Sequence, residues 1–153
     1  MTPRLNLFAT GAATMQGWVD LAKTSANDGL DPKLKELVTM RISQINGCGF
    51  CLHFHLADAR KAGESEDRLH LLAAWRESAL YSDRERAALG WTEALTLIAQ
   101  THAPDEAYEE LRRHFSDDEQ VKLTSIIAQT NAWNRFNIGF RSVHPAEQQK
   151  KAA

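Results

Sequence analysis

Hydrophobic residues recur at helical spacing along most of this chain. The first such stretch places its apolar residues on one helical face: Met15, Trp18, Val19 and Ala22. A period near 3.6 residues is typical of amphipathic helices, and no segment gives a convincing strand pattern. The pattern predicts helices over residues 10–26, 31–46, 48–63, 67–80, 82–101, 104–114 and 116–140. The predicted fold class is all-α, a single-domain helical bundle of about six or seven helices.

Residues that begin helices stand at several of the predicted ends. Asp31 precedes a proline, which is a typical N-cap followed by the first helical position. Ser82 with Glu85, and Ser116 with Glu119, have the spacing of a capping box, in which each partner accepts a hydrogen bond from a free backbone N–H group. The predicted helix over residues 48–63 is apolar on more than one face, so we expect it in the interior.

Length and composition indicate one globular domain. The chain has 153 residues, of which 43% are hydrophobic and 25% are charged, values typical of a folded domain with a single core. We predict that residues 1–145 form this domain. Residues 146–153 contain no apolar side chain larger than alanine, so we predict a disordered tail there.

The charge pattern argues against polyanionic partners. A formal charge of −2 leaves no basic surface for nucleic acid or for an anionic membrane. No apolar stretch approaches the roughly 20 residues of a membrane-spanning helix, and the first residues lack the pattern of a secretory signal. These observations predict a cytoplasmic protein without nucleic-acid or membrane partners.

Both cysteines of the chain lie in one short segment, Cys48-Gly49-Phe50-Cys51. Structural disulfides are rare in a reducing cytosol, and a bridge across so few residues constrains the unfolded chain little. A close pair therefore indicates redox chemistry or metal binding. At about 100° per residue, His55 falls roughly 20° from Cys48 on the helix and one turn beyond Cys51. We expect the helix N-terminus to favour a thiolate and His55 to act as its base.

Other interpretations of these residues stay open at the level of sequence. Cys48, Cys51 and His55 could supply three zinc ligands, with His53 or Glu36 as the fourth, in a small zinc-binding or structural helical module. The thiols could also be inert core residues. By spacing alone Glu36 is a solvated acid near a helix N-terminus.

Arg41 is an anomaly, because it falls beside the apolar stripe of its predicted helix. Its side chain could reach along the helix to solvent, form an ion pair or lie at a subunit boundary.

The order Glu36, Cys48, Cys51, His55, with gaps of 12, 3 and 4, resembles the signature of the AhpD-like (alkyl hydroperoxide reductase D) branch of the carboxymuconolactone decarboxylase superfamily. The resemblance extends over roughly residues 10–142 and includes the segments 82–89 and 131–135. It implies a helical fold that assembles as a trimer or hexamer, and a thiol peroxidase or disulfide reductase without an organic cofactor. The implied substrate is a small hydroperoxide, and the implied partner is a thiol or dithiol reductant.

The resemblance also implies roles for the individual residues. Cys51 would attack peroxide, Cys48 would resolve the oxidised product, and Glu36 with His55 would relay protons. One departure concerns Phe50, since members of this branch often place a histidine between the cysteines. Decarboxylase members of the superfamily generally lack the cysteine pair, so its presence here argues against a decarboxylase.

Overall fold

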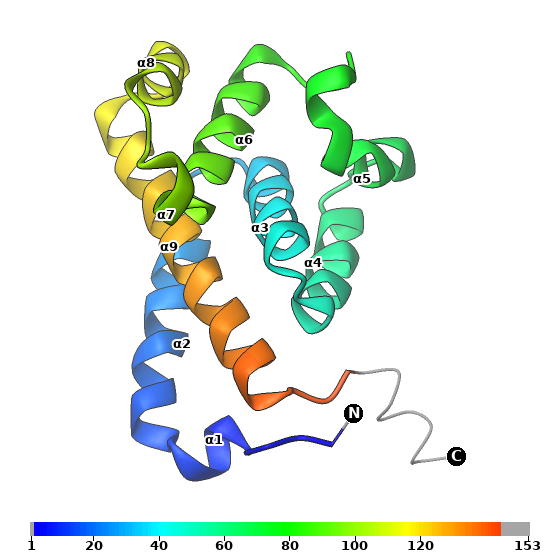
Figure 1. The fold of residues 1–153 in the computed structure, drawn as a ribbon, viewed down its shortest axis with the longest axis vertical. Coiled ribbons are helices and arrows are strands. Elements are labelled where there is room, and N and C mark those ends of the chain that lie inside the picture. The colour runs from blue at the N-terminus through cyan, green and yellow to red at the C-terminus, as the bar shows by residue number, and fades with distance from the viewer. Residues whose placement is uncertain (1, 145–153) are drawn as a thin grey trace.

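The computed structural model describes residues 2–144, and helices form the framework of this part of the chain (Figure 1). Within these residues there is no strand. The α-helices are α1 (Leu7–Thr10), α2 (Ala12–Ala26), α3 (Pro32–Asn46), α4 (Gly49–Lys61), α5 (Glu66–Leu71), α6 (Asp83–Thr96), α7 (Ile98–Thr101), α8 (Asp105–His114) and α9 (Asp117–Phe140); a 3₁₀ helix, η1, covers Leu72–Glu77. The predicted all-α class is confirmed, and the predicted disordered tail lies outside the described residues.

The described part has more helices than the six or seven predicted, for local reasons. A short helix, α1, precedes the first predicted one, because the Asn6 side chain caps it by accepting a hydrogen bond from the Ala9 N–H group. Ala74 departs from helical geometry and Leu97 lies between α6 and α7 with φ −100° and ψ 29°, so two predicted helices are each divided. None of these breaks lies at a proline or glycine.

The predicted helix starts are confirmed at the level of individual hydrogen bonds. The Asp31 side chain caps α3 by accepting from the Lys33 N–H group, and Pro32 occupies the first turn. Complete capping boxes open α6 at Ser82 and α9 at Ser116. Backbone donors that no helical carbonyl can reach are thus satisfied locally.

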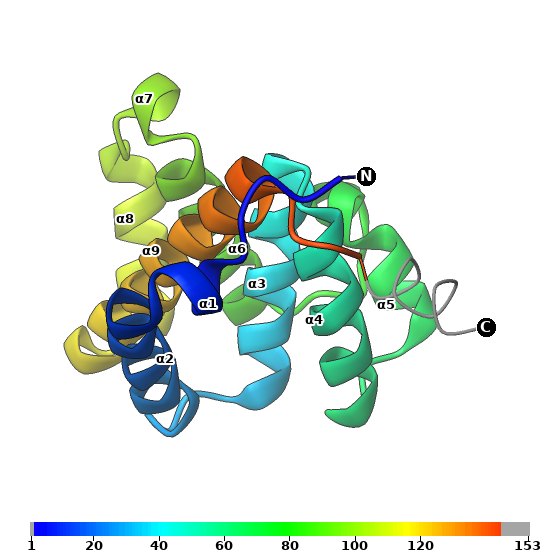
Figure 2. The ribbon, with the colours of Figure 1, turned by 90° about the horizontal axis from the view of Figure 1, so that it is seen from below.

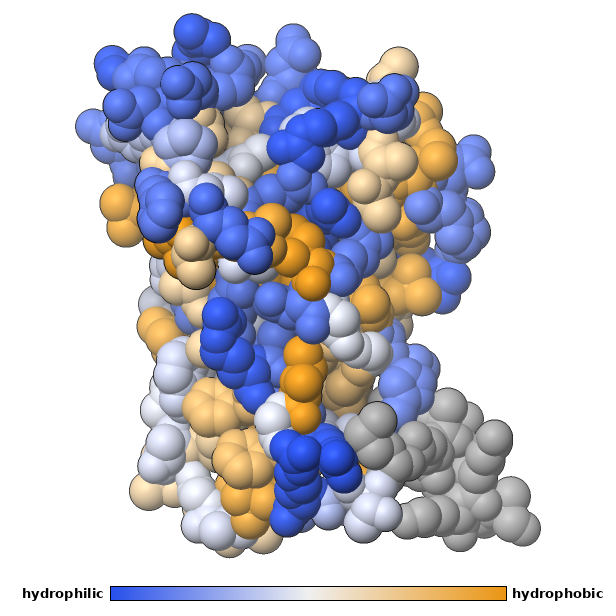
Figure 3. Space-filling model, viewed as in Figure 1, coloured by the Kyte–Doolittle hydropathy of each residue, from blue (hydrophilic) through white to orange (hydrophobic). Residues whose placement is uncertain are grey.

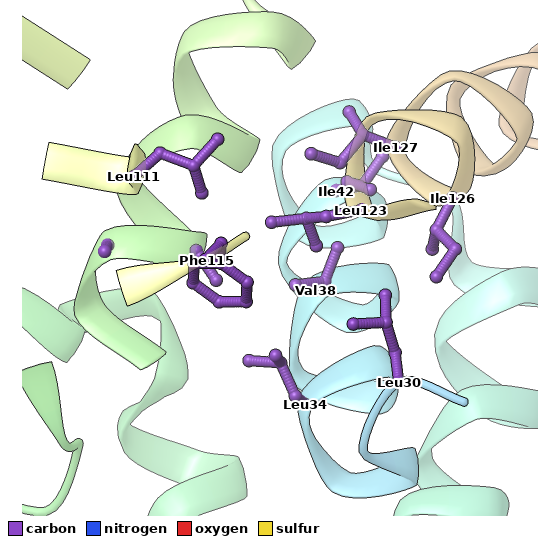
Figure 4. Close-up of a cluster of buried hydrophobic side chains, with 11 residues drawn as sticks. Leu30, Leu34, Val38, Ile42, Leu111, Phe115, Leu123, Ile126 and Ile127 are labelled. Carbon is purple, nitrogen blue, oxygen red and sulfur yellow. The ribbon is translucent and has the colours of Figure 1, made fainter. Parts of the chain in front are cut away.

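Helix α3 lies at the centre of the fold, with its largest interfaces against α4, α6 and α9. One face of α3 joins apolar residues of the C-terminal half in a single cluster (Figure 4), with these members: Leu30, Leu34, Val38, Ile42, Ala87, Ala88, Leu111, Phe115, Leu123, Ile126 and Ile127. A second cluster, containing Leu37, Met40, Leu72, Trp75 and Leu89, fills the space on the side of η1. Helix α3 is thus buried on two faces, one in each cluster, and this packing fixes its position next to the site.

Helix α4 departs from the expectation of an interior helix. Only Cys51 and Ala59 of this helix are buried, and the Phe54 side chain is 48% exposed. Of its other apolar residues, Leu56 packs against the second cluster while only partly buried, and Phe50 and Phe54 border a cavity.

Arg41 is ion-paired, one of the three explanations considered for it. Its Nε lies 2.7 Å from Glu93 Oε1 on α6, and both side chains are largely buried. The same carboxylate accepts a hydrogen bond from Trp75 Nε1 at 2.9 Å and pairs with Arg76. This cluster ties α3 to α6 and η1 through charge-assisted hydrogen bonds.

The N-terminal segment crosses the end of α9, as the view of Figure 2 shows. Backbone N–H of Arg4 donates to the Phe140 carbonyl at 3.0 Å, and Arg4 Nη1 donates to the Gly139 carbonyl at 2.9 Å. The last turn of α9 is therefore held by residues from the opposite end of the chain.

The surface in the orientation of Figure 1 is mostly polar, with separate apolar patches (Figure 3). Within residues 2–144, no helix has both the length and the apolar character that crossing a membrane requires.

Candidate active site

The cysteine pair lies at a sharp turn between α3 and α4. Gly47 adopts a left-handed conformation with φ 71°, and the Cys48 N–H group donates to the Ser43 carbonyl at 2.9 Å, which closes the end of α3. This geometry favours glycine because a Cβ atom is strained there. Cys48 then serves as the N-cap of α4, and its sulfur accepts a hydrogen bond from the Cys51 N–H group at 3.3 Å.

A disulfide joins Cys48 and Cys51, whose Cα atoms are 5.4 Å apart. Both side chains are buried, with exposed fractions of 1% and 5% respectively. Only Cys51 of the two lines a cavity. The two sulfurs thus differ in their access to small molecules.

Glu36 and His55 form a pair beside this disulfide. Helix α3 carries Glu36 and helix α4 carries His55, and Glu36 Oε2 lies 2.9 Å from His55 Nδ1. Their side chains are 20% and 29% exposed, so the solvated position that spacing alone gave Glu36 is wrong. The carboxylate oxygen is an acceptor, so it favours a proton on Nδ1 and leaves Nε2 for exchange with another group.

A cavity of about 370 Å³ brings these residues together between α2, α3, α4 and α9. Glu36, Cys51 and His55 line it, together with apolar and neutral polar side chains that include Phe50, Phe54, Ile126, Thr130, Trp133 and Asn137. Lys35 also lines it, but its ammonium group binds Asp28 at 2.6 Å and the Ser25 and Ala26 carbonyls. The structure therefore places three of the four predicted residues on one cavity wall, with Cys48 directly behind Cys51.

A second cavity of about 640 Å³ lies next to the first, beneath the N-terminal segment. Phe50, Trp133 and Asn137 line both cavities. The Phe50 ring also contacts Phe54, with ring centroids 4.8 Å apart. Phe50, between the two cysteines, is thus part of an apolar wall.

Asn137 is a site residue that the sequence reasoning missed. Its Nδ2 lies 3.5 Å from the Cys51 sulfur, across 86 positions of sequence. A signal was present, since Asn131, Asn134 and Asn137 recur three residues apart on one helix. The first two fix the position of α9, because Asn46 Nδ2 donates to their side-chain oxygens at 2.9 and 3.0 Å.

The zinc alternative finds no ligand set in the described part of the chain. Among residues 2–144, no three side chains of His, Cys, Asp or Glu come together as a metal site requires. His53, considered as a fourth ligand, is exposed and lies against the rings of Phe54 and His144, with centroids 6.0 and 4.8 Å away.

Fold and site together define a class of protein: an all-α domain in which a Cys-x-x-Cys pair borders a cavity beside a Glu–His pair. The model of the carboxymuconolactone decarboxylase family matches residues 12–94. The chain belongs to this family.

Relatives extend the similarity beyond the matched segment. The uncharacterised protein YdfG of Bacillus subtilis is 39% identical over 138 residues, which cover 90% of this chain and 94% of the relative. Uncharacterised protein YnjA of Escherichia coli is 34% identical over 79% of this chain and 64% of its own length.

Solved structures agree on the fold. A protein of unknown function from Agrobacterium tumefaciens, named as a candidate antioxidant defence protein AhpD, has a TM-score of 0.92 at 43% identity, covering 94% of this chain and 99% of that chain. The resemblance to the AhpD-like branch is confirmed. The debrominase Bmp8 has a TM-score of 0.79 at 22% identity over 91% of this chain and 75% of its own, which shows a shared fold.

Proposed function

We propose that this protein is a thiol-dependent peroxidase of the alkyl hydroperoxide reductase type, or a disulfide reductase, that uses Cys51 and Cys48. The proposal rests on one observation. Cys51, one of the two cysteines of the disulfide, lines a cavity that the hydrogen-bonded pair His55 and Glu36 also lines. A nucleophile, a base and a group that orients the base are the elements of an activated thiol.

In the oxidative half of the cycle, the Cys51 thiolate attacks a hydroperoxide oxygen. An S–O bond forms, the O–O bond breaks, and His55 protonates the departing alkoxide, which leaves as an alcohol. The Cys48 thiolate then attacks the oxidised Cys51 sulfur. The S–S bond forms as the S–O bond breaks, and the departing hydroxide takes up a proton and leaves as water. Glu36 binds the His55 ring while the ring carries the proton that it passes to the alkoxide.

In the reductive half, an external thiolate attacks the accessible sulfur, Cys51, and Cys48 leaves. The Cys48 sulfur accepts the Cys51 N–H group at the N-terminus of α4, which stabilises it as a thiolate. A more stable thiolate is a better leaving group, so exchange is directed toward Cys51. The second thiol of a dithiol reductant then releases Cys51 and completes the two-electron reduction.

We do not propose decarboxylation, because this chain carries the cysteine pair that decarboxylase members of the superfamily generally lack. In the proposed cycle each of the four predicted residues has a distinct role in thiol chemistry.

Stopped-flow peroxide consumption by pre-reduced single variants tests the proposal. Cys51→Ser is expected to abolish consumption even in the first turnover. Cys48→Ser should keep the first turnover and leave Cys51 as a sulfenic acid, visible by mass spectrometry as one added oxygen. A burst that survives in Cys51→Ser and is lost in Cys48→Ser would reverse the two roles.

The same variants separate the two activities within the proposal. Reduction of a small disulfide by the reduced protein, without peroxide consumption, would assign the chain as a disulfide reductase. Full activity of both serine variants in both assays would contradict the thiol mechanism.

A further inference from the structure

The Cys51 sulfur has a hydrogen-bond donor that the proposed proton relay does not use. Asn137 Nδ2 points at it from α9 at 3.5 Å, within the range for a donor to sulfur. Cys51 is 5% exposed, so few water molecules can compete for the sulfur. In a dry setting a donor stabilises a neighbouring negative charge more than it does in water.

Two neighbours fix which end of the Asn137 amide faces the sulfur. The Trp133 carbonyl lies 3.0 Å from Nδ2, and a carbonyl only accepts, so the atom facing it must be the NH₂ group. Ser142 Oγ donates to Asn137 Oδ1 at 2.7 Å, which holds the opposite end of the amide. One hydrogen of the NH₂ group thus binds Trp133 and the other is directed to Cys51.

Ser142 itself is held by the closure of α9. Arg141 ends the helix in a left-handed conformation, and the Ser142 N–H group donates to the Asn137 carbonyl at 2.9 Å. Arg4 donates twice to the last turn, at Gly139 and Phe140. These hydrogen bonds therefore fix the position of Ser142, whose hydroxyl group in turn orients the Asn137 amide.

We propose that Asn137 is a positioning residue that holds the Cys51 sulfur and stabilises its thiolate, with Ser142 fixing the orientation of the amide. Without this donor only Cys48, at the helix N-terminus, would have an N–H group on its sulfur. The pair needs both thiolates in turn, Cys51 for attack and Cys48 for resolution. The Asn137 amide stabilises the Cys51 thiolate by a hydrogen bond, as the Cys51 N–H group at the N-terminus of α4 stabilises the Cys48 thiolate.

Few other titratable groups share the cavity with Cys51, and the variants used to test the proposal do not change them. Lys35 and Glu36 of α3 and His55 of α4 are the titratable side chains that share its cavity. The residues that α2 and α9 contribute to the cavity wall do not titrate.

Alkylation of Cys51 across a pH series tests this proposal. With Cys48→Ser as the common background, the rate of iodoacetamide modification reports the thiolate fraction of Cys51 alone. Asn137→Ala is expected to raise the midpoint by about one pH unit, which reduces the thiolate fraction roughly tenfold below the midpoint. Asn137→Asp should raise it further because a carboxylate repels the thiolate. Ser142→Ala should give a smaller shift in the same direction.

Asn27→Ala is the matched control. Asn27 Nδ2 donates to the carbonyl four residues earlier, Lys23, at 2.9 Å, as Asn137 does to Trp133, but it makes no hydrogen bond to a sulfur atom. Its removal should leave the midpoint unchanged. A midpoint unchanged in both Asn137→Ala and Ser142→Ala, with parental melting temperatures, would overturn the proposal. The inference rests on the proposed function for Cys51 as the attacking thiol, but alkylation needs no peroxide, so failure of either can be recognised separately.

Discussion

The His55 ring has two nitrogens, and the Glu36 carboxylate contacts one of them, Nδ1. Glu36 Oε2 lies 2.9 Å from Nδ1, so in the proposed cycle the exchanged proton passes through Nε2. In this proposal Glu36 orients the ring and favours the tautomer that carries its proton on Nδ1.

Substitution of this pair should slow the attack on peroxide. His55→Ala is expected to lower the rate of the first turnover roughly 100-fold or more, the usual contribution of a positioned acid or base. Glu36→Gln should give a smaller loss, because the ring remains but its partner is neutral. The loss in His55→Ala should be largest below the pKa of the Cys51 thiol, where the base is needed, and a pH series of stopped-flow rates measures it.

His53→Ala provides the control for these variants. His53 lies on the same helix, two residues before His55, but its exposed ring faces Phe54 and His144. A comparable loss of rate in this variant would show that the effect of His55→Ala is a general one on α4.

At the residue scale, the sequence indicated contacts within one helix better than contacts between helices. Cys48 is the N-cap of α4, and Cys51 and His55 lie in its first two turns, so their spacing alone placed them on one helix face. The partnership of Glu36 with His55 depends on how α3 lies against α4, and only the family resemblance indicated it. Asn137 reaches Cys51 from α9, and no local pattern fixes the packing of α9 against α4.

At the scale of elements, Glu93 connects α3, α6 and η1. Burial raises the pKa of its carboxyl group, but hydrogen bonds from Trp75, Arg76 and Arg41 outweigh burial and hold the pKa below its ordinary value. A pKa lowered on folding means that the ionised carboxylate stabilises the folded state. This stabilisation is complete above the ordinary value of 4.5 and is lost as the pH falls through the lowered pKa.

Glu93→Gln should therefore destabilise the protein in a pH-dependent way. At pH 7 the expected loss is about 2 kcal/mol, the scale of hydrogen bonds to a charged group, because Arg41 keeps its charge without its partner. The difference from the parent should shrink as the pH falls below the ordinary pKa, where the parent carboxylate itself becomes protonated. Urea unfolding between pH 7 and pH 3 measures both effects.

Glu66→Gln is the control for this measurement. Its carboxylate pairs with Arg60 at 2.6 Å, but both side chains are about half exposed. Solvent screens such pairs, so the expected loss at pH 7 is much smaller than that of Glu93→Gln. An equal loss in the two variants would mean that burial of the Glu93 cluster contributes nothing.

Element boundaries divide into those that local chemistry fixes and those that packing fixes. Asp31, Ser82 and Ser116 bind backbone donors within three residues, so their helix starts could be predicted from the sequence. The break at Leu97 has no proline or glycine to mark it. The distortion at Ala74 likewise has no proline or glycine beside it. Alanine has high helix propensity, so tertiary contacts must override propensity there.

At the scale of the whole molecule, many large apolar side chains are only partly covered. Of the four tryptophans only Trp75 is buried. A shallow cavity of about 410 Å³ on the side of α7 and α9 has an apolar lining that includes Leu95, Ile98 and Ile127, and Ile98 is 52% exposed. Aromatic and aliphatic residues in such positions favour subunit interfaces.

The prediction of a trimer or hexamer can be tested by mass-resolved size-exclusion chromatography. We expect the parent protein to form a defined oligomer at micromolar concentration, and Ile98→Asp to shift it toward smaller species because a charge enters an apolar contact. Leu71→Asp is the comparison variant, since Leu71 is 43% exposed on α5, on the opposite side of the molecule from α7 in Figure 1. A monomeric parent would contradict the prediction.

The contact of one amide with both Trp133 and the cysteine pair has an optical consequence. Asn137 Nδ2 lies 3.0 Å from the Trp133 backbone carbonyl and 3.5 Å from the Cys51 sulfur, and Trp133 lines the same cavity as Cys51. Disulfides quench indole fluorescence by accepting an electron from the excited ring. Tryptophan emission is therefore expected to rise when a dithiol reduces the protein, and Trp133→Phe should remove most of that rise. The protein would then report its own redox state by light, without an added dye.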